Sequence, residues 1–282
     1  MSSQLDPNGW TNEDWLLKRY KYVPSTAAAI IFAVLFGAST AVHLFQLLRT
    51  KTWYFIPFLV GGLFETSGYI MRALDTKAAS KLLFINQTSV ILLAPALYAA
   101  SIYMILKRVI ILLDAQAYSL IRVQWLTRVF VGGDVVSFLL QGAGGAMQAS
   151  DASVKPGRQD LAKILVVGGL VLQLVAFSFF VILTAAFHLR IRRQPTVASA
   201  ALDIPWVRYT YVLYFGSSMV MIRSIFRVIE YIQGRDGYLI SHEVFFYVLD
   251  ATMMLVVSIE FNAAHPSKLA WSSRKHELSL LR

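Results

Sequence analysis

The chain of 282 residues contains no cysteine, and this absence removes several kinds of chemistry. It can form no disulfide, no thiolate metal site and no cysteine nucleophile. The five histidines are scattered without the spacing of metal ligands, so the sequence predicts no metal site and no cofactor. The G-x-x-x-x-G-K-[ST] motif is also absent, so built-in ATP hydrolysis is not expected.

Charge is scarce as well. Only 15% of the residues are charged and 57% are hydrophobic, and the mean hydropathy is +0.58. Soluble domains are typically ~25% charged and ~45–50% apolar. The excess comes from long apolar blocks, which is typical of an integral membrane protein. The polar first fifteen residues lack the basic and apolar regions of a cleaved signal peptide, so we expect the first block to direct insertion.

The apolar blocks predict an all-α protein with seven transmembrane helices in one bundle, because a helix needs ~20 apolar residues to cross a bilayer. The blocks are too long and too uniformly apolar for the alternating strands of a barrel. The predicted spans are residues 24–48, 53–73, 82–106, 126–147, 161–189, 209–232 and 241–262. We divide the chain into an extracellular segment (1–23), the transmembrane domain (24–265) and a cytoplasmic tail (266–282).

The orientation follows from the basic residues. Fourteen Lys and Arg flank the spans on one side and nine flank them on the other, which favours an outside N-terminus and a cytoplasmic C-terminus. The net charge of +10 would suit nucleic acid if it formed one soluble surface, but it is divided among short loops. We therefore expect membrane lipids or amphiphilic small molecules as partners and no nucleic acid, and the sequence does not identify any protein partner.

Nine charged residues fall inside the predicted spans or at their edges. Each central charge costs ~2.5–3.5 kcal/mol on the insertion scale, so such groups should face the bundle interior and pair. Several follow helical spacing. Two turns separate Glu65 from Arg72, and the same interval separates Asp134 from Gln141, Arg223 from Glu230 and Glu243 from Asp250. Four spans therefore carry a polar face of similar period, and we expect these faces to share one interior. The nine are Arg72, Arg223, Arg227, Glu65, Asp134, Glu230, Glu243, Asp250 and Glu260.

Two interpretations of these charges stay open. They could be structural ion pairs that lock helices together. They could instead form a path for an amphiphile with a positive head, with the carboxylates as counter-ions. Carboxyl groups held neutral in the low-dielectric interior would weaken that preference and allow proton coupling. On the second interpretation, Glu230, Glu243 and Asp250 line an amine site, and Arg72 and Arg227 close the empty site by pairing.

Three local patterns predict structure within the spans. Pro95 should bend its helix and free a backbone carbonyl. The small residues of "GGLFETSG" and "QGAGGAM" indicate close helix packing. Gly234 and Gly237 fit a tight turn between the last two spans.

The chain resembles the fungal RTA-like proteins, the lipid-translocating exporter family named for resistance to aminocholesterol. Five segments carry the resemblance in chain order, followed by "HPS", and together they cover most of the chain. They are "GGLFETSGYIMRAL", "LLAPALYAASIYMILKR", "GGDVVSFLLQGAGG", "GGLVLQLVAFSFF" and "IRSIFRVIEYIQGRDGYLISHEVFFYVLD". One departure is an N-terminus without a glycosylation sequon.

The resemblance implies a seven-span fungal membrane protein, often at the plasma membrane. It implies export of sphingoid long-chain bases or related toxic amphiphiles, and hence drug resistance. The family's polar and charged positions fall on Glu65, Arg72, Gln87, Asp134, Gln141, Arg227, Glu230, Glu243 and Asp250.

The main alternative is a seven-span receptor or sensor of lipid stress. However, no D-R-Y motif ends the third span, no N-P-x-x-Y motif ends the seventh, and Asp250 stands in a seventh span that has no lysine for retinal. An intramembrane enzyme is a third alternative. No Ser/His/Asp grouping supports it, so no enzymatic activity is expected.

Overall fold

The computed structural model describes residues 11–149, 156–201, 206–234 and 237–267, which form helices and turns with no β-strand among them. The long helices are α2 (Thr26–Thr50), α3 (Ile56–Ala78), α4 (Lys81–Leu112), α5 (Val123–Ala149), α6 (Pro156–Arg193) and α8 (Trp206–Gln233). The last long segment comprises α9 (Glu243–Phe245), a π-helical turn (Phe246–Ala251) and α10 (Thr252–Ala263). The short elements are α1 (Asn12–Tyr20), α7 (Val197–Ala201) and the 3₁₀ turns Trp53–Phe55 and Gln116–Tyr118.

Each of the seven predicted spans coincides with a long helix or, for the last, with the α9–π–α10 segment. Within the described residues, six of these segments are long and apolar enough to cross a membrane, which fits a multi-pass membrane protein. The segment outside this set is α3, which carries Glu65, Arg72, Asp75 and Lys77 and is therefore less apolar than its neighbours. The span count of seven and the orientation of the termini stay predictions.

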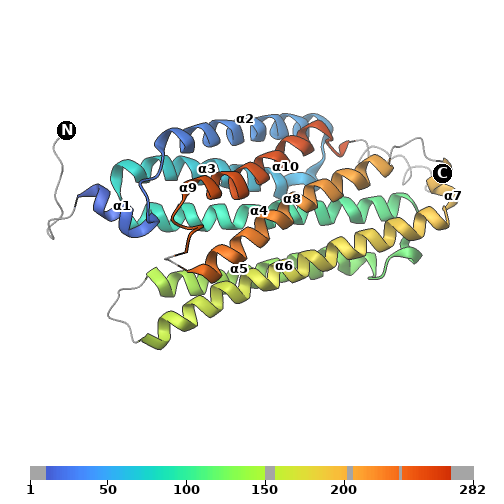
Figure 1. Ribbon diagram of the computed structural model, residues 1–282. Helices are drawn as coiled ribbons and strands as arrows, with labels where there is room; N and C mark the ends of the chain where they lie inside the picture. Colours follow the sequence, from blue (N-terminus) through green and yellow to red (C-terminus); the bar gives the residue numbers. More distant parts are fainter. Residues whose placement is uncertain (1–10, 150–155, 202–205, 235–236, 268–282) are drawn as a thin grey trace.

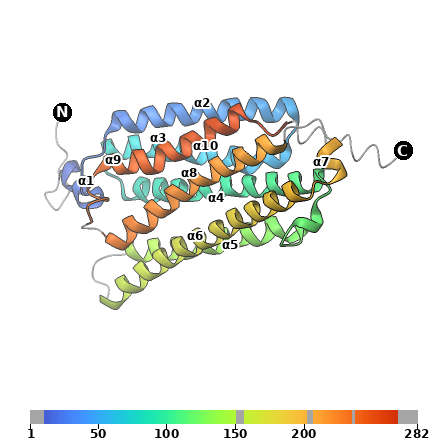
Figure 2. The same ribbon diagram turned by 45° about the vertical axis from the view of Figure 1, so that its right-hand side comes forward.

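The helices form one bundle with α4 in its middle (Figures 1 and 2). Helices α2, α3 and α10 lie on one side of α4, and the antiparallel pair α5 and α6 lies on the other. Helix α8 crosses obliquely from α6 to α10. Helices α1 and α9 lie at one end of the bundle and α7 at the other. The loops therefore alternate between two ends, as a chain that repeatedly crosses a membrane requires.

Small residues bring the helices close together. A Cβ atom on Gly61 of α3 would lie 2.7 Å from the Tyr98 ring of α4. A Cβ atom on Gly144 of α5 would lie 2.6 Å from the carbonyl oxygen of Ala162 in α6. Neither distance is possible for real atoms without a shift of the neighbour, so the predicted close packing at both glycine-containing segments is confirmed.

The segment predicted to be extracellular (1–23) contains a packed helix, α1. Thr11 caps α1 through a reciprocal pair of hydrogen bonds with Asp14, and this capping box fixes the start of the helix. Lys21 has φ of 65°, a left-handed conformation that ends the helix. Leu16 and Tyr20 are buried against the bundle. The chain between α1 and α2 therefore crosses the end of the bundle at a fixed position.

Candidate functional site

The deepest charged residues lie where α8 meets the π-helical turn. Arg223 of α8 donates a hydrogen bond from Nε to Oδ1 of Asp250. Both side chains are buried, Asp250 completely. Burying an unpaired arginine or carboxylate would destabilise the protein by several kcal/mol, and pairing the two groups avoids most of this penalty.

Arg223 also binds the backbone of α4. Its Nη2 donates to the carbonyl oxygen of Ile91 at 3.1 Å. In an unbroken helix that oxygen would accept from the N–H of the residue four positions later. That residue is Pro95, which has no N–H, so the carbonyl is left for the arginine. The prediction that Pro95 frees a backbone carbonyl is confirmed, and the structure identifies its new donor.

A change of helical register places Asp250 at this point. Residues Phe246–Ala251 form a π-helical turn inside an otherwise α-helical segment. The Thr252 hydroxyl donates to the carbonyl oxygen of Tyr247 at 2.8 Å, which satisfies an acceptor in the widened turn. Single π turns are frequent at functional sites because they re-aim one side chain relative to the rest of the helix. Sequence spacing alone did not predict this turn.

Arg227, one helical turn after Arg223, extends the same cluster. Its Nη1 lies 2.7 Å from Oε2 of Glu230 and 3.8 Å from Oδ2 of Asp250. Its guanidinium also lies 5.2 Å from the centroid of the Tyr231 ring. Asp250 is therefore shared between two arginines, while Glu230 is held by one.

Glu65 of α3 faces this cluster without joining its hydrogen bonds. Its side chain is completely buried, and within the described part of the chain neither carboxyl oxygen has a hydrogen-bond partner. Arg223 and Asp250 are close enough to act on it electrostatically. We call Glu65, Arg223, Arg227, Glu230 and Asp250 the central cluster.

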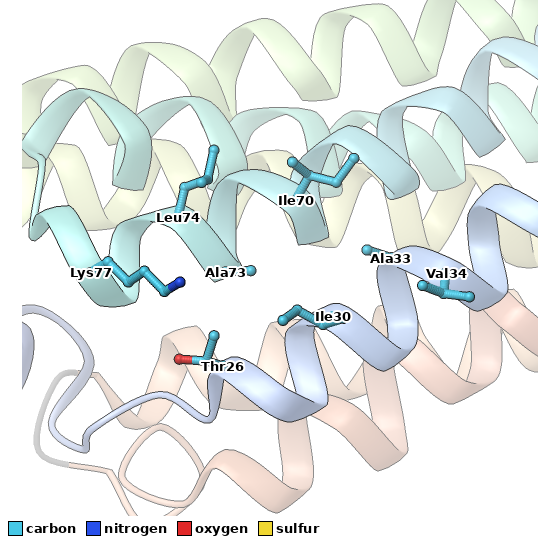
Figure 3. A pocket seen from close by; sticks show the side chains of 8 residues that line it. All are labelled: Thr26, Ile30, Ala33, Val34, Ile70, Ala73, Leu74 and Lys77. Carbon is cyan, nitrogen blue, oxygen red and sulfur yellow. The ribbon is translucent and has the colours of Figure 1, made fainter.

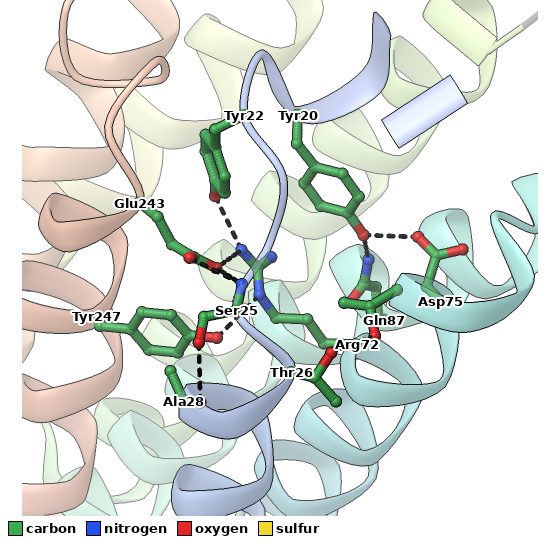
Figure 4. Close-up of polar contacts among 11 residues, drawn as sticks. Tyr20, Tyr22, Ser25, Thr26, Ala28, Arg72, Asp75, Gln87, Glu243 and Tyr247 are labelled. Carbon is green, nitrogen blue, oxygen red and sulfur yellow. Dashed lines mark hydrogen bonds and ion pairs between the residues drawn. The ribbon is translucent and has the colours of Figure 1, made fainter. Parts of the chain in front are cut away.

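A second group of polar contacts surrounds Arg72 near the end of the bundle that carries α1 (Figure 4). Its Nη2 lies 3.1 Å from Oε1 of Glu243 and donates to the Tyr22 hydroxyl at 2.8 Å, and its Nε donates to the Tyr247 hydroxyl at 3.2 Å. The Phe246 ring lies 4.4 Å from the guanidinium. We call Arg72 and these partners the outer cluster.

The chain before α2 closes over the outer cluster. The backbone N–H of Ser25 donates to both carboxylate oxygens of Glu243, at 3.0 and 2.9 Å. Tyr20 donates from its hydroxyl to Oδ2 of Asp75 at 2.7 Å and accepts from Nε2 of Gln87 (Figure 4). Burial raises the pKa of the hydroxyl groups of Tyr20 and Tyr22, so both stay protonated.

Two predicted site residues lie elsewhere. Asp134 of α5 is buried beside the hydroxyl of Tyr103, which belongs to α4. Gln141, two turns further along α5, donates from Nε2 to Oε1 of Gln173 in α6 at 3.2 Å. Among the described residues neither is paired with an arginine, and both belong to the interfaces of α5 with its neighbours. The spacing predicted one shared polar interior. In the structure, Asp134 and Gln141 of α5 lie apart from the central and outer clusters.

The other seven predicted residues fall in or beside the two clusters. Glu65, Arg227, Glu230 and Asp250 are central, Arg72 and Glu243 are outer, and Gln87 adjoins the outer group through Tyr20. Arg223 was predicted as a charge within a span but not as a site residue. Tyr20, Tyr22 and Asp75 were not predicted because they lie outside the predicted spans, and the backbone contact of Ser25 has no signal in the sequence. The spacing of Asp75 from Arg72, three residues or about one helical turn, could have pointed to Asp75.

An apolar groove of about 350 Å³ opens between α2 and α3 (Figure 3). Its walls are apolar side chains from both helices, and its one polar end holds Thr26 and Lys77. Thr26 directly follows Ser25, whose N–H binds Glu243, so this end of the groove adjoins the outer cluster. The full lining is Thr26, Ile30, Ala33, Val34, Ile70, Ala73, Leu74 and Lys77.

The described residues contain no group of His, Asp and Glu side chains that could hold a metal ion. The fold and the clusters define a polytopic α-helical membrane protein with paired charges buried between its helices. Residues 58–273 match the family described as "RTA1 like protein". The chain belongs to this family, which confirms the resemblance seen in the sequence.

Three relatives show how far the similarity extends. "Protoporphyrin uptake protein 1" of Saccharomyces cerevisiae is 36% identical over 279 residues, which cover 86% of this chain and 90% of that protein. "Protein RTA1" of the same yeast is 34% identical over 88% of this chain and 84% of its own length. "Sphingoid long-chain base transporter RSB1" of that yeast is 26% identical over 86% and 72%. No solved structure matches the chain.

The names of these relatives indicate membrane transport at the level of the family. They differ in what is moved, because one names a porphyrin and another a long-chain base. They are also names of uptake and transport proteins and not of enzymes. The family therefore indicates membrane transport without specifying the substrate.

Proposed function

We propose that this protein exports amphiphiles with a positively charged head, such as sphingoid long-chain bases or related toxic compounds, and thereby confers resistance to them. The proposal involves no enzymatic step. Membrane lipids and amphiphilic small molecules are the partners it requires. The substrate would move between the two ends of the bundle along the outer and central clusters.

The observation that carries the proposal is the pairing within the central cluster. Arg227 lies against both Glu230 and Asp250, and Arg223 occupies the other oxygen of Asp250. An ammonium group carries the same charge as a guanidinium and can replace it beside a carboxylate. A site whose carboxylates are already held by cationic side chains can therefore take a cationic substrate by exchange of partners.

The groove between α2 and α3 supports the same function. Its apolar walls suit a hydrocarbon tail, and its polar end adjoins the outer cluster. Lys77 at that end would repel an ammonium group that stayed there. We therefore place the head at Glu243, beyond the groove, with the tail in contact with Ile30 and Leu74.

We further propose seven spans, with α3 crossing the membrane, an outside N-terminus and a cytoplasmic C-terminus, at the plasma membrane. The alternation of the loops between two bundle ends supports this arrangement (Figure 1). The outer cluster would then face the outside. Buried in the interior, Glu65 and Arg72 are compatible with a span, since charges of a membrane helix face the bundle and not the lipid.

Growth of fungal cells on a toxic long-chain base tests the proposal. Cells that produce the protein should grow at concentrations that stop cells without it. Asp250→Asn, which removes the charge shared by two arginines, should abolish this resistance while expression continues. Asp160→Asn, an exposed residue of α6, is the matched control and should grow like the unchanged protein. Normal resistance in a well-expressed Asp250→Asn strain would remove Asp250 from the path.

A sensor of lipid stress would give a different result. It would bind the long-chain base, and resistance would depend on other proteins that it activates. Movement of the base by the purified protein separates these two functions.

A further inference from the structure

The central cluster contains one more acidic group than basic groups. Two arginines, Arg223 and Arg227, face three carboxyl groups, those of Glu65, Glu230 and Asp250. Asp250 and Glu230 are the two that lie in contact with arginine. Glu65 is the surplus carboxyl group, because within the described residues neither of its oxygens has a partner.

The surroundings of Glu65 offer nothing to balance an additional charge. Tyr69 and Tyr98 face it from α3 and α4, while Arg223 and Asp250 face it from α8 and the π-helical turn. On α2 the buried titratable group is His43, which contacts the Phe58 ring of α3 and hydrogen-bonds the carbonyl oxygen of Ser258. Among the described residues, the cation that faces Glu65 is Arg223, which is already bound to Asp250.

The charge balance around Glu65 favours one of its two protonation states. With Glu65 ionised, the cluster carries a net charge of −1 in a buried site. With Glu65 protonated, its net charge is zero. Burying an uncompensated charge costs several kcal/mol, so this arrangement favours the protonated form of Glu65.

We propose that Glu65 is the coupling residue of the exporter and exchanges this proton for the cationic head of the substrate. The inference rests on the proposed function and names its coupling ion. The protonated carboxyl group loses its proton to solution, and the resulting carboxylate pairs with the incoming ammonium. The total charge is +1 on each side of this exchange. Each monovalent cation moved is therefore matched by one proton moved in the opposite direction, and transport is electroneutral.

Asp134 provides a contrast within the same molecule. It is also a buried carboxyl group, but it lies between α4 and α5 beside Tyr103, away from the arginines of the central cluster. It can be neutralised without changing the charge balance around Arg223. Asp134→Asn is therefore the matched control for Glu65→Gln.

Proton release on binding tests the proposal directly. The purified full-length protein, in neutral detergent and weak buffer, is titrated with a long-chain base trimethylated on its nitrogen. This probe is permanently charged and cannot itself carry a proton. A pH-sensitive dye should report about one proton released for each probe molecule bound. Glu65→Gln should release none, and Asp134→Asn should release as many as the unchanged protein.

Each other outcome overturns the proposal in a recognisable way. Binding without proton release by the unchanged protein removes the proton coupling and leaves export standing. Undiminished release from folded Glu65→Gln assigns the proton to another group. No binding of the probe at all contradicts both this proposal and the proposed function. If Glu65→Gln does not fold, Glu65→Asp should shift the pH of half-maximal release, and an unchanged midpoint would contradict the assignment.

Discussion

Arg223 of α8 donates a hydrogen bond from Nη2 to the carbonyl oxygen of Ile91 in α4 at 3.1 Å. The bond joins the middle helix of the bundle to the central cluster through a backbone group, because Pro95 leaves that carbonyl without its helical donor. The guanidinium is thereby positioned from two directions, by Asp250 and by the Ile91 carbonyl of α4. A proline in one helix therefore helps to set the position of a charge in another.

Replacing this proline should reduce export without unfolding the protein. Pro95→Ala restores an N–H that competes with Arg223 for the Ile91 carbonyl. Resistance to a long-chain base should fall, while the unfolding temperature of the purified protein should stay the same or rise. Pro57→Ala is the control, because Pro57 lies in the first turn of α3, where a missing N–H costs nothing. Full resistance in Pro95→Ala would show that the contact between Arg223 and the Ile91 carbonyl is not needed.

The absence of native cysteine makes the seven-span arrangement testable. Lys51→Cys lies in the connection before α3, and Ala78→Cys is at the last residue of α3. If α3 crosses the membrane, a membrane-impermeant maleimide should label Ala78→Cys on intact cells and Lys51→Cys only after permeabilisation. Labelling of both residues from the same side would show that α3 does not cross.

Close packing between α3 and α4 predicts a strong effect of one added methyl group. Gly61→Ala places a Cβ 2.7 Å from the Tyr98 ring and 3.0 Å from the carbonyl oxygen of Ala94. Such overpacking typically costs about 1–3 kcal/mol in the free energy of unfolding. Gly132→Ala in α5 meets no atom within 4 Å and serves as the control. The unfolding temperature should fall for Gly61→Ala and stay unchanged for Gly132→Ala. Equal unfolding temperatures would mean that the two helices can separate freely.

The attachment of α1 to the bundle should depend on the hydroxyl group of Tyr20. Tyr20→Phe leaves Oδ2 of buried Asp75 without its donor and the amide of Gln87 without its acceptor. Leaving a buried polar group unsatisfied costs about 1–3 kcal/mol, so α1 should detach more readily. Hydrogen exchange of the α1 amides should be faster in this variant. Tyr238→Phe, which changes an exposed ring, should leave that exchange unaltered.

The sequence was sufficient for the positions of the helices, because long apolar blocks and buried glycines leave few alternatives. It was also sufficient to place Arg223, Arg227 and Glu230 on one helix face, although the pairing of Arg227 with Glu230 is seen only in the structure. The π-helical turn could not be predicted, because it is stabilised by contacts that form only in the folded protein. One of these is the hydrogen bond from the Thr252 hydroxyl to the carbonyl oxygen of Tyr247. The contact between Ser25 and Glu243 joins residues 218 positions apart, and no periodicity within one helix reports such a contact.

The separation of Asp134 from the other charges could not be predicted for the same reason. Its spacing from Gln141 predicts one polar face of α5, and the structure has both residues buried. Periodicity says which side of a helix is polar, whereas the packing of α5 beside α4 and α6 decides what that side meets. Only the three-dimensional arrangement shows that this face meets Tyr103 and Gln173 instead of the arginines.

The measurement that tests the account most directly is movement of a labelled sphingoid long-chain base across proteoliposomes that contain only this protein. Saturable movement that disappears in Asp250→Asn, with Asp160→Asn unaffected, is the predicted result. It would establish that the protein transports the base by itself and that the central cluster is part of the path. A folded protein that binds the base and moves none of it would contradict autonomous export and would favour a sensor.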